Sequence, residues 1–370
     1  MLVVPVTWGP EPFTKAEIEG AVFGRAADRL HRASFGKLTV TGTVLPWQKV
    51  LTARMFCSDR QRIYNLAAVA AGSQVGDYGD VMVVLPPFGP CDELGHGDIG
   101  GDRLWIYGTL DTITLVHELG HTLGLDHANA WVRGRAREYG DPFSTMGHGP
   151  GDWDAHAKWQ LGWGIRIADA HEGVFELGPL ERPSALAQAL RVRTAGNDFW
   201  IDHREPVGLD GWLTPRLANG VLIHAEPNSS EPTADVRYRG TNVLLPVGTD
   251  DGSPWVLAPG REFTQRGVFR LSVLSHVGGR VTVRFRWLDR TRPTRPALRP
   301  GPCSALGWSR SRDAASGVAR YEVRLGRRLV ARVDDDFRFE PGADVRGHGR
   351  VTVVAVDRAG NRSPAASRRC

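Results

Sequence analysis

The sequence predicts an α+β domain of about 160 residues followed by two all-β sandwich domains. Three observations predict this class. Up to residue 164, apolar runs of strand length alternate with stretches of helical period. From 165 to 290 only short apolar runs occur, separated by Gly, Pro and Asp turns. A proline-rich linker, 291–300, precedes a last unit, so we expect domains at 1–164, 165–290 and 291–370.

The first domain begins with a strand that leads into an amphipathic helix. Thr14 is a typical N-cap, and apolar residues such as Ile18 and Val22 follow it at helical spacing. The same patterns recur along the domain. The expected strands are 2–7, 38–44, 81–85 and 104–107. The expected helices are 14–32, 59–71, 111–123 and 152–161.

The rest of the chain is expected to be built from strands. Its apolar runs are short, and turn residues separate them. In the second domain the clearest candidate strands are 199–201, 220–224, 268–274 and 281–285. In the last domain they are 305–308, 318–325, 328–333 and 350–356.

Composition excludes two classes of partner. The net charge is +5, but the basic residues are scattered and do not alternate with aromatic residues, so nucleic-acid binding is not expected. No stretch approaches the ~20 apolar residues that a membrane-spanning helix needs. The expected partner is therefore neither a nucleic acid nor a lipid bilayer, and we expect a monomer.

The four cysteines favour an oxidising compartment. Cys57, Cys91, Cys303 and Cys370 form no C-x-x-C pair, and their positions favour the pairs Cys57–Cys91 and Cys303–Cys370. Four free buried thiols are the alternative. Residues 2–7 have the pattern of a strand and not of a secretory signal. Either a signal segment is absent from this sequence or the protein stays inside the cell, and we expect the first, with an extracellular protein.

The segment from His117 to His127 carries the clearest chemistry. His117 and His121 are one helical turn apart, so both imidazoles face one ion, and Glu118 follows as a candidate general base. Gly124 permits the turn that brings His127 to the same ion. Three neutral histidines leave one position of a tetrahedral zinc ion open, which is typical of a catalytic site.

This motif resembles the extended zinc motif of the metzincin metallopeptidases. Ser144-Thr-Met146-Gly147 lies where that clan has its Met-turn, with Met146 19 positions after His127. Within the clan the chain is most similar to the gametolysin-like peptidases (M11 type), over about residues 1–290. The segments that carry this narrower resemblance are 34–37, 139–147 and 156–163.

The resemblance implies a metzincin-like catalytic domain with a mixed sheet, one zinc ion, and Met146 packed beneath the metal and not bound to it. It also implies a protein or peptide substrate, with cell-wall or extracellular glycoproteins among the candidates. Such substrates lie extended along an edge strand. The candidate edge strand is Arg103, Leu104, Trp105, Ile106 and Tyr107.

Two features depart from the pattern of the clan. No tyrosine directly follows Met146, so a tyrosine that switches on and off the metal is not expected. His148 is instead a candidate for lining the cleft. No second general acid stands out, so Glu118 would have to carry the proton to the leaving amine.

Several other residues have a structural interpretation beside a functional one. Asp126 either caps its turn or orients a zinc histidine. His96 is expected at the surface, and His203 and His224 are expected to be structural. The acidic residues of one loop are candidates for a Ca²⁺ site, although their spacing matches no EF-hand. They are Asp92, Glu93, Asp98 and Asp102. The spacing of Trp153, Trp159 and Trp163 favours a core over a carbohydrate platform.

The last domain resembles a fibronectin type III module. The resemblance rests on Trp308, on residues 316–323 and on residues 353–363. In such a sandwich Cys303 and Cys370 would lie at the same end, which makes their pairing plausible. A fold of this kind is compatible with a spacer or an adhesion unit.

We therefore expect a secreted zinc-dependent endopeptidase in which Glu118 acts as general base. The alternative is a catalytically inactive, zinc-stabilised binding or adhesion protein outside the cell. Glu118 and Gly124 are both present, and a purely structural zinc site has no need of the base.

Overall fold

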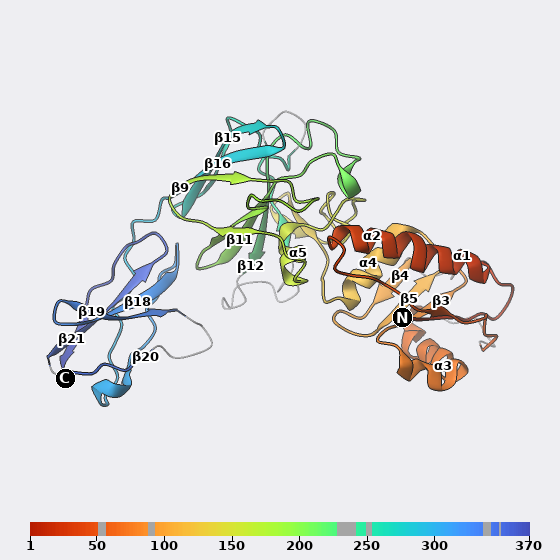
Figure 1. Ribbon diagram of the computed structural model, residues 1–370, viewed down its shortest axis with the longest axis horizontal. Helices are drawn as coiled ribbons and strands as arrows, with labels where there is room; N and C mark the ends of the chain where they lie inside the picture. The colour runs from red at the N-terminus through yellow and green to blue at the C-terminus, as the bar shows by residue number, and fades with distance from the viewer. Residues whose placement is uncertain (51–56, 88–92, 228–241, 249–253, 336–341, 348) are drawn as a thin grey trace.

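The computed structural model describes the chain except for residues 51–56, 88–92, 228–241, 249–253, 336–341 and 348. Figure 1 shows three units in chain order, from the helix-bearing N-terminal unit on the right to the blue C-terminal strands on the left. The described part confirms a mixed α/β region followed by a region that is largely β.

A five-stranded sheet forms the centre of the first unit, in the order β2-β1-β3-β5-β4. Strands β2, β1, β3 and β5 run parallel, and β4 runs antiparallel to β5. The bounds are β1 (Leu2–Pro5), β2 (Thr43–Val44), β3 (Val81–Leu85), β4 (Gly95–Gly97) and β5 (Arg103–Tyr107). Only Thr43 and Val44 of the expected strand 38–44 pair with the sheet.

The prediction that Arg103–Tyr107 is the edge strand is wrong. β5 lies between β3 and β4, so the edge is formed by the three residues of β4. The reason is that the chain returns after β3 as Gly95-His96-Gly97 and pairs with the outer side of β5 before β5 itself is reached in the sequence. A segment this short shows no hydrophobic alternation that could reveal it.

Helices cover both faces of this sheet. Thr14 caps the first helix in a capping box with Glu17. That helix continues through a π-helical segment, so the expected helix 14–32 is confirmed. Its parts are α1 (Lys15–Glu19), η1 (Gly20–Ala26) and α2 (Ala27–Ala33). The other helices are α3 (Arg60–Ala71), α4 (Thr112–Thr122) and α5 (Ala155–Gln160).

Burial on both faces explains the continuous apolar run of β3. Val83 and its alternate neighbours pack with Ile63 of α3 on one face. Met82 and Val84 pack with Ile18 of α1 and with Leu115 of α4 on the other. A strand of a parallel sheet covered on both sides needs apolar residues at every position. This packing fixes α4, and with it the histidine motif, against the sheet.

The second unit consists of two sheets that share a core. A seven-stranded sheet has the order β7-β6-β13-β12-β11-β10-β8, and a four-stranded sheet has the order β14-β15-β16-β9. Ile201 and Ile223 of the first sheet and Val273 and Phe285 of the second lie in one buried cluster. The first sheet comprises β6 (Asn129–Val132), β7 (Arg135–Arg137), β8 (Ile167–Asp169), β10 (Ala189–Arg193), β11 (Asn197–Asp202), β12 (Leu222–Pro227) and β13 (Val243–Leu244). The second comprises β9 (Gly173–Leu177), β14 (Glu262–Gln265), β15 (Phe269–Val277) and β16 (Arg280–Trp287).

The seven-stranded sheet crosses the domain boundary expected at residue 164. β6 and β7 precede that residue, yet β6 pairs in parallel with β13 through Asn129 and Val243. The chain that leaves the histidine motif therefore enters the sheet of the second unit directly.

The last unit contains a four-stranded sheet, β19-β18-β21-β22, and a pair, β17 with β20. Its core includes Trp308 and Tyr321. The expected pair Cys303–Cys370 is confirmed, with Cα atoms 5.9 Å apart, whereas Cys91, and with it the expected pair with Cys57, lies outside the described residues. The strands are β17 (Leu306–Gly307), β18 (Val318–Leu325), β19 (Arg328–Asp334), β20 (Gly342–Ala343), β21 (Arg350–Asp357) and β22 (Ala366–Arg369).

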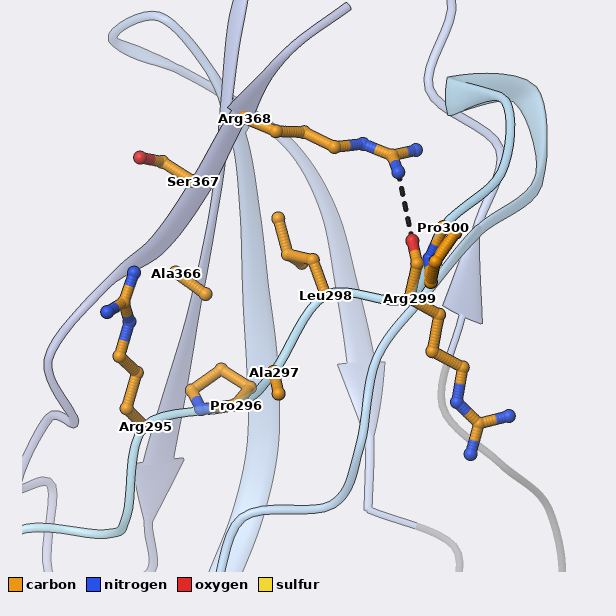
Figure 2. Close-up of a pocket in the computed structure, with 9 residues that line it drawn as sticks. All are labelled: Arg295, Pro296, Ala297, Leu298, Arg299, Pro300, Ala366, Ser367 and Arg368. Carbon is orange, nitrogen blue, oxygen red and sulfur yellow. Dashed lines mark hydrogen bonds between the residues drawn. The ribbon is translucent and has the colours of Figure 1, made fainter.

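The proline-rich linker packs against the last unit. Arg368 of β22 donates a hydrogen bond to the carbonyl of Arg299 at 2.9 Å (Figure 2). Residues 295–300 and 366–368 enclose a hollow of about 520 Å³. In the part of the chain that the structure covers, no helix has the length and apolarity needed to cross a membrane.

Candidate metal centre

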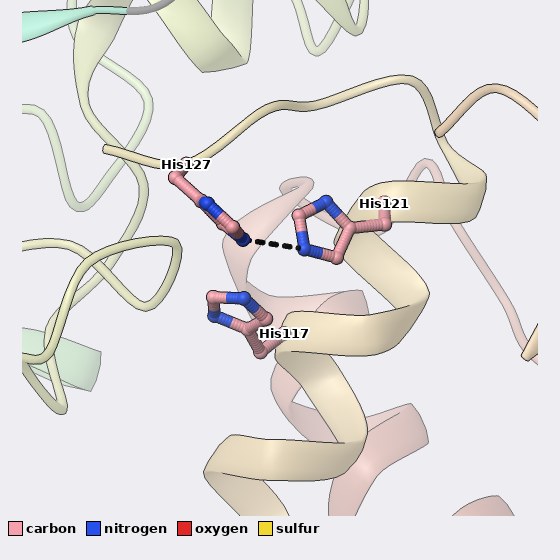
Figure 3. Close-up of side chains that lie close together, drawn as sticks. All are labelled: His117, His121 and His127. Atoms are coloured by element: carbon pink, nitrogen blue, oxygen red, sulfur yellow. Dashed lines mark hydrogen bonds between the residues drawn. The ribbon is translucent and has the colours of Figure 1, made fainter. Parts of the chain in front are cut away.

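Helix α4 presents the first two histidines. The side chain of Asp111 caps the helix by accepting from the backbone N–H of Thr114 at 2.9 Å. One face of α4 packs on the sheet through residues such as Leu115. His117 and His121 are both nearly buried and project together from the helix (Figure 3).

The third histidine reaches the same space because the helix ends in a left-handed residue. Gly124 has φ 99°, as expected for the turn that follows α4. Its N–H donates to the carbonyl of His121 at 2.8 Å. His127 then faces the helix, and ligand atoms of His117, His121 and His127 lie within 4.8 Å of one another (Figure 3). The structure thus brings the three predicted ligands together.

Each of the three imidazoles is held through its Nδ1 atom. Nδ1 of His117 lies 2.8 Å from the carbonyl oxygen of Thr145, and Nδ1 of His121 lies 2.8 Å from that of Leu125. Nδ1 of His127 lies 2.8 Å from Oε1 of Glu138. All three partners accept hydrogen bonds, so each Nδ1 carries the proton and each Nε2 presents a lone pair.

These lone pairs create a site that fits a cation. The Nε2 atoms of His121 and His127 are 3.1 Å apart, a separation at which two lone pairs repel. A cation bound between the rings removes that repulsion, and three imidazole nitrogens are a donor set that zinc accepts. Burial lowers the pKa of His117 and of His121 to about 4, so both are neutral, as metal ligands must be, at pH 7.

The side chain of Glu118, a residue of α4, lies against the edge strand β4. A Cβ atom at Gly95 would come within 2.6 Å of Cγ of Glu118, so the absence of a side chain at residue 95 makes room for the carboxylate. Burial raises the pKa of Glu118 to about 8, although a backbone hydrogen bond from Gly97 opposes this. The carboxyl group is therefore poised to exchange a proton near neutral pH.

The turn at Met146 supports the site from below. Met146 is buried, and its sulfur occupies the space that a Cβ atom would take at Gly120 of α4. Its carbonyl accepts a hydrogen bond from the N–H of Ala128, next to His127, at 2.9 Å. Met146 thus packs against α4 at Gly120, and the neighbouring Thr145 supplies the acceptor for His117.

Asp126 caps its own turn and does not orient a histidine. Its Oδ1 accepts from the backbone N–H of His127 at 2.7 Å. The carboxylate that contacts a histidine ring is that of Glu138, which the sequence did not single out. Glu138 is 11 residues from His127, and only the return of the chain through β6 and β7 brings the two together.

Tyr139 is a second residue that sequence reasoning missed as part of the site. Its ring packs on His127, with centroids 3.8 Å apart, and on His117 at 5.6 Å. Its φ of 56° is unusual for a residue other than glycine, and a hydrogen bond from its N–H to Oδ1 of Asn129 holds it there. Burial raises its pKa to about 12, so the phenol stays protonated.

A hollow of about 460 Å³ lies beside the histidines. Residues near β4, residues of α4, Tyr139 and the turn at Met146 line it, and they include Glu118. His148 lines the same hollow, as expected, and its Nδ1 lies 2.7 Å from the carbonyl oxygen of Tyr139. The hollow in Figure 2 is different, because its lining includes three arginines and no carboxylate or imidazole.

The three described acidic residues of the expected calcium loop do not gather as a cation site. Asp92 lies outside the described residues. Glu93 is 3.4 Å from Arg60, and Asp98 and Asp102 lie 3.1 and 3.5 Å from Arg103. Carboxylates paired with arginine do not offer the oxygen cage that Ca²⁺ needs.

His96 does not join the zinc ligands. It lies in β4, is about one-third exposed, and its ring packs against Trp105 at 5.8 Å. It is therefore separate from the three imidazoles that converge.

His224 lies in a buried network of charges behind the site. Its Nε2 is 3.0 Å from Asp141, and its Nδ1 is 3.5 Å from Asp202. Burial opposes the charged form, but these carboxylates raise the pKa of His224 to about 10. This position agrees with the structural role expected for His224.

Two of the three tryptophans expected in the core are buried there, and the third is not. Trp153 and Trp163 lie in the core of the first unit. Trp159 is 45% exposed because it lies on the outer side of α5, where it packs on Trp200 of β11 at 5.2 Å. The expectation of a core position is wrong for Trp159.

One family model matches part of the chain. Residues 65–181 match the model of the gametolysin peptidases, family M11. This confirms the resemblance found from the motifs, over a shorter stretch than residues 1–290, and the matched part contains all three histidines, Glu118 and Met146. The family implies a zinc metallopeptidase.

Other comparisons add less. No curated protein matches the chain. A solved structure described as fibronectin(III)-like modules of CbhA from Clostridium thermocellum is 17% identical and covers 41% of this chain and 84% of its own, with a TM-score of 0.20. A score this low does not establish a shared fold, so the fibronectin-like nature of the last unit stays a prediction.

Proposed function

We propose that the protein is a secreted zinc-dependent endopeptidase whose metal ion is held by His117, His121 and His127. The observation that carries this proposal is the convergence of three Nε2 lone pairs beside a buried carboxyl group at an open hollow. The match of residues 65–181 to the gametolysin peptidases supports it independently.

The metal ion and two side chains would have separate roles in peptide hydrolysis. Bound zinc would lower the pKa of a water molecule and polarise the scissile carbonyl group. A carboxylate oxygen of Glu118 accepts the proton of the attacking water. Glu118 then donates this proton to the amide nitrogen that leaves. Tyr139 holds the ring of His127 in place and shields it on one side.

The substrate is proposed to lie along β4. Among the described strands, β4 is the last of its sheet, and its outer edge has no strand beside it. An extended peptide can pair with such an edge through its backbone. Glu118 packs against Gly95 of this strand, so a peptide bound there passes next to the carboxyl group. This assignment replaces Arg103–Tyr107 as the substrate strand.

The compartment is proposed from the disulfide. The bond between Cys303 and Cys370 is typical of proteins that fold in oxidising surroundings. An extracellular location also suits a peptidase that acts on extracellular proteins or peptides.

The experiment is cleavage-site profiling on a proteome-derived peptide library with zinc-loaded full-length protein. The wild type is expected to cleave internal peptide bonds, and Glu118→Gln to lose activity by about 10²–10⁴-fold while its zinc content stays the same. Chelation is expected to abolish cleavage and Zn²⁺ to restore it.

Two results would contradict the proposal. Full cleavage by pure Glu118→Gln would exclude Glu118 as the general base. No cleavage of any peptide by zinc-loaded wild type would favour the alternative, an inactive zinc-stabilised binding or adhesion protein.

A further inference from the structure

A second group of metal-ligating side chains lies in the second unit. His203 directly follows β11, Glu205 is two residues further on, and His276 belongs to β15. Ligand atoms of these three residues lie within 4.8 Å of one another. The Nε2 atoms of His203 and His276 are each 2.9 Å from the same oxygen, Oε1 of Glu205.

The outer nitrogens of both rings are held by hydrogen-bond acceptors. Nδ1 of His203 lies 2.9 Å from the carbonyl oxygen of Gly220, and Nδ1 of His276 lies 3.2 Å from Oδ1 of Asn219. Each Nδ1 therefore carries a proton, and in the neutral ring each Nε2 presents a lone pair. Both lone pairs face a carboxylate oxygen, which is also an acceptor.

Positive charge between these groups resolves this arrangement. One solution is a second proton on each ring, but the two rings then carry like charges with centroids 4.6 Å apart. His203 is fully buried, which makes such a charge costly. The other solution is one metal ion bound by all three groups, which leaves both rings neutral.

We propose that His203, Glu205 and His276 form a second binding site for a divalent transition-metal ion, with Zn²⁺ as the first candidate. Two imidazoles and one carboxylate are a known donor set for zinc. Ligand atoms of one tetrahedral ion with bonds of about 2.0–2.2 Å lie about 3.3–3.6 Å apart, so the N···O separations of 2.9 Å need to widen by only about half an ångström to admit the ion. The side chains of Glu205 and His276 are each 18% exposed, so an ion can enter from solvent.

The site links the two sheets of the second unit. His203 continues β11 of the seven-stranded sheet, and His276 is part of β15 of the four-stranded sheet. Asn219 and Gly220, which hold both rings, precede β12. A bound ion therefore crosslinks the two sheets where the end of β11, the residues before β12 and β15 meet. This gives His203 a more specific role than the structural one expected from sequence.

The experiment counts metal ions in full-length protein. Wild type and variants are stripped with a chelator, reloaded with ZnCl₂, gel-filtered and analysed by inductively coupled plasma mass spectrometry. We expect two zinc ions per wild-type chain, one in His276→Ala, one in His121→Ala and none in the double variant. Glu205→Gln, which preserves size and hydrogen bonding, is expected to lose the same ion as His276→Ala.

A matched control is His171→Ala, which removes an exposed histidine of the same unit and should leave two ions. Circular dichroism and elution volume verify that each variant is folded. One ion in the wild type, lost entirely in His121→Ala, would overturn the proposal and leave protons as the charge between the rings. Two ions in folded Glu205→Gln would overturn it as well. Because these counts need no substrate, they stand whether or not the protein cleaves peptides.

Discussion

The two histidine clusters orient their imidazole rings in the same way but in different surroundings. In both, oxygen acceptors hold Nδ1, and Nε2 faces inward. In the first cluster Glu118 lies beside the three converging rings, at a hollow, and is not among the converging ligands. In the second, Glu205 lies directly between the rings. The carboxylate therefore stands beside the converging rings in the first cluster and is itself one of the converging ligands in the second.

The sharpest test of this comparison makes the same change at both carboxylates. Glu118→Gln should reduce peptide cleavage by about 10²–10⁴-fold and keep its zinc, because the group moves a proton and binds no metal. Glu205→Gln should lose one zinc ion, because its carboxylate is a ligand. Cleavage rates and zinc counts on the same samples measure both. Equal zinc counts for the two variants would contradict the proposed difference between Glu118, which binds no metal, and Glu205, which is a ligand.

A smaller effect is expected when Glu118 is displaced and not replaced. Gly95→Ala places a methyl group within 2.6 Å of Cγ of Glu118, so the carboxyl group must shift. A shift of about 1 Å can cost about 10²-fold in rate. Cleavage should fall while zinc content stays the same. Gly76→Ala, where a Cβ atom has open space, is the control, and equal rates for the two variants would show that Glu118 adapts.

The hydrogen bond to His127 should affect metal affinity more than chemistry. Glu138→Gln removes the negative acceptor at Nδ1, and losing such a partner typically weakens metal binding by about 10–100-fold. Competition with a zinc-binding dye measures this. Glu19→Gln, in an exposed position on α1, is the control. Unchanged affinity in Glu138→Gln would mean that Tyr139 alone orients the ring.

In metal-free protein, the free energy of unfolding below neutral pH should depend on the histidines of the first cluster. The pKa values of His117 and His121 are about 4 in the folded chain, below the usual ~6.5 of the unfolded chain. The unfolded state therefore binds more protons between these values, and stability falls as pH drops from about 6.5 to 4. His121→Gln should flatten this slope in urea titrations, and an unchanged slope would contradict the assignment.

Much of the fold was predictable because strong patterns coincide with burial. The five residues of β3 are apolar since both faces of the sheet are covered, and α4 is marked by its cap and its histidine spacing. β4 was missed because three residues, two of them glycine, show no period. β6 escaped notice because its partner, β13, is more than a hundred residues away in the chain.

The candidate site was predictable where spacing alone fixes geometry. His117, His121, Gly124 and His127 lie within one helix and one turn, so their sequence positions determine their arrangement. Their partners were hidden, because two are backbone carbonyls, which any residue supplies. The second cluster was hidden by distance, since His203 and His276 are brought together only by the packing of two sheets.

The pairing of β6 with β13 has a consequence for the order of events during synthesis. β6 begins two residues after His127, and its partner ends at Leu244. At about 5–20 residues per second, a ribosome needs roughly 5–20 s to add the intervening ~110 residues. Until then β6, the strand that follows the third histidine, can pair with β7 but not with β13. The sheet that continues from the histidine motif is therefore completed only after the second unit has been synthesised.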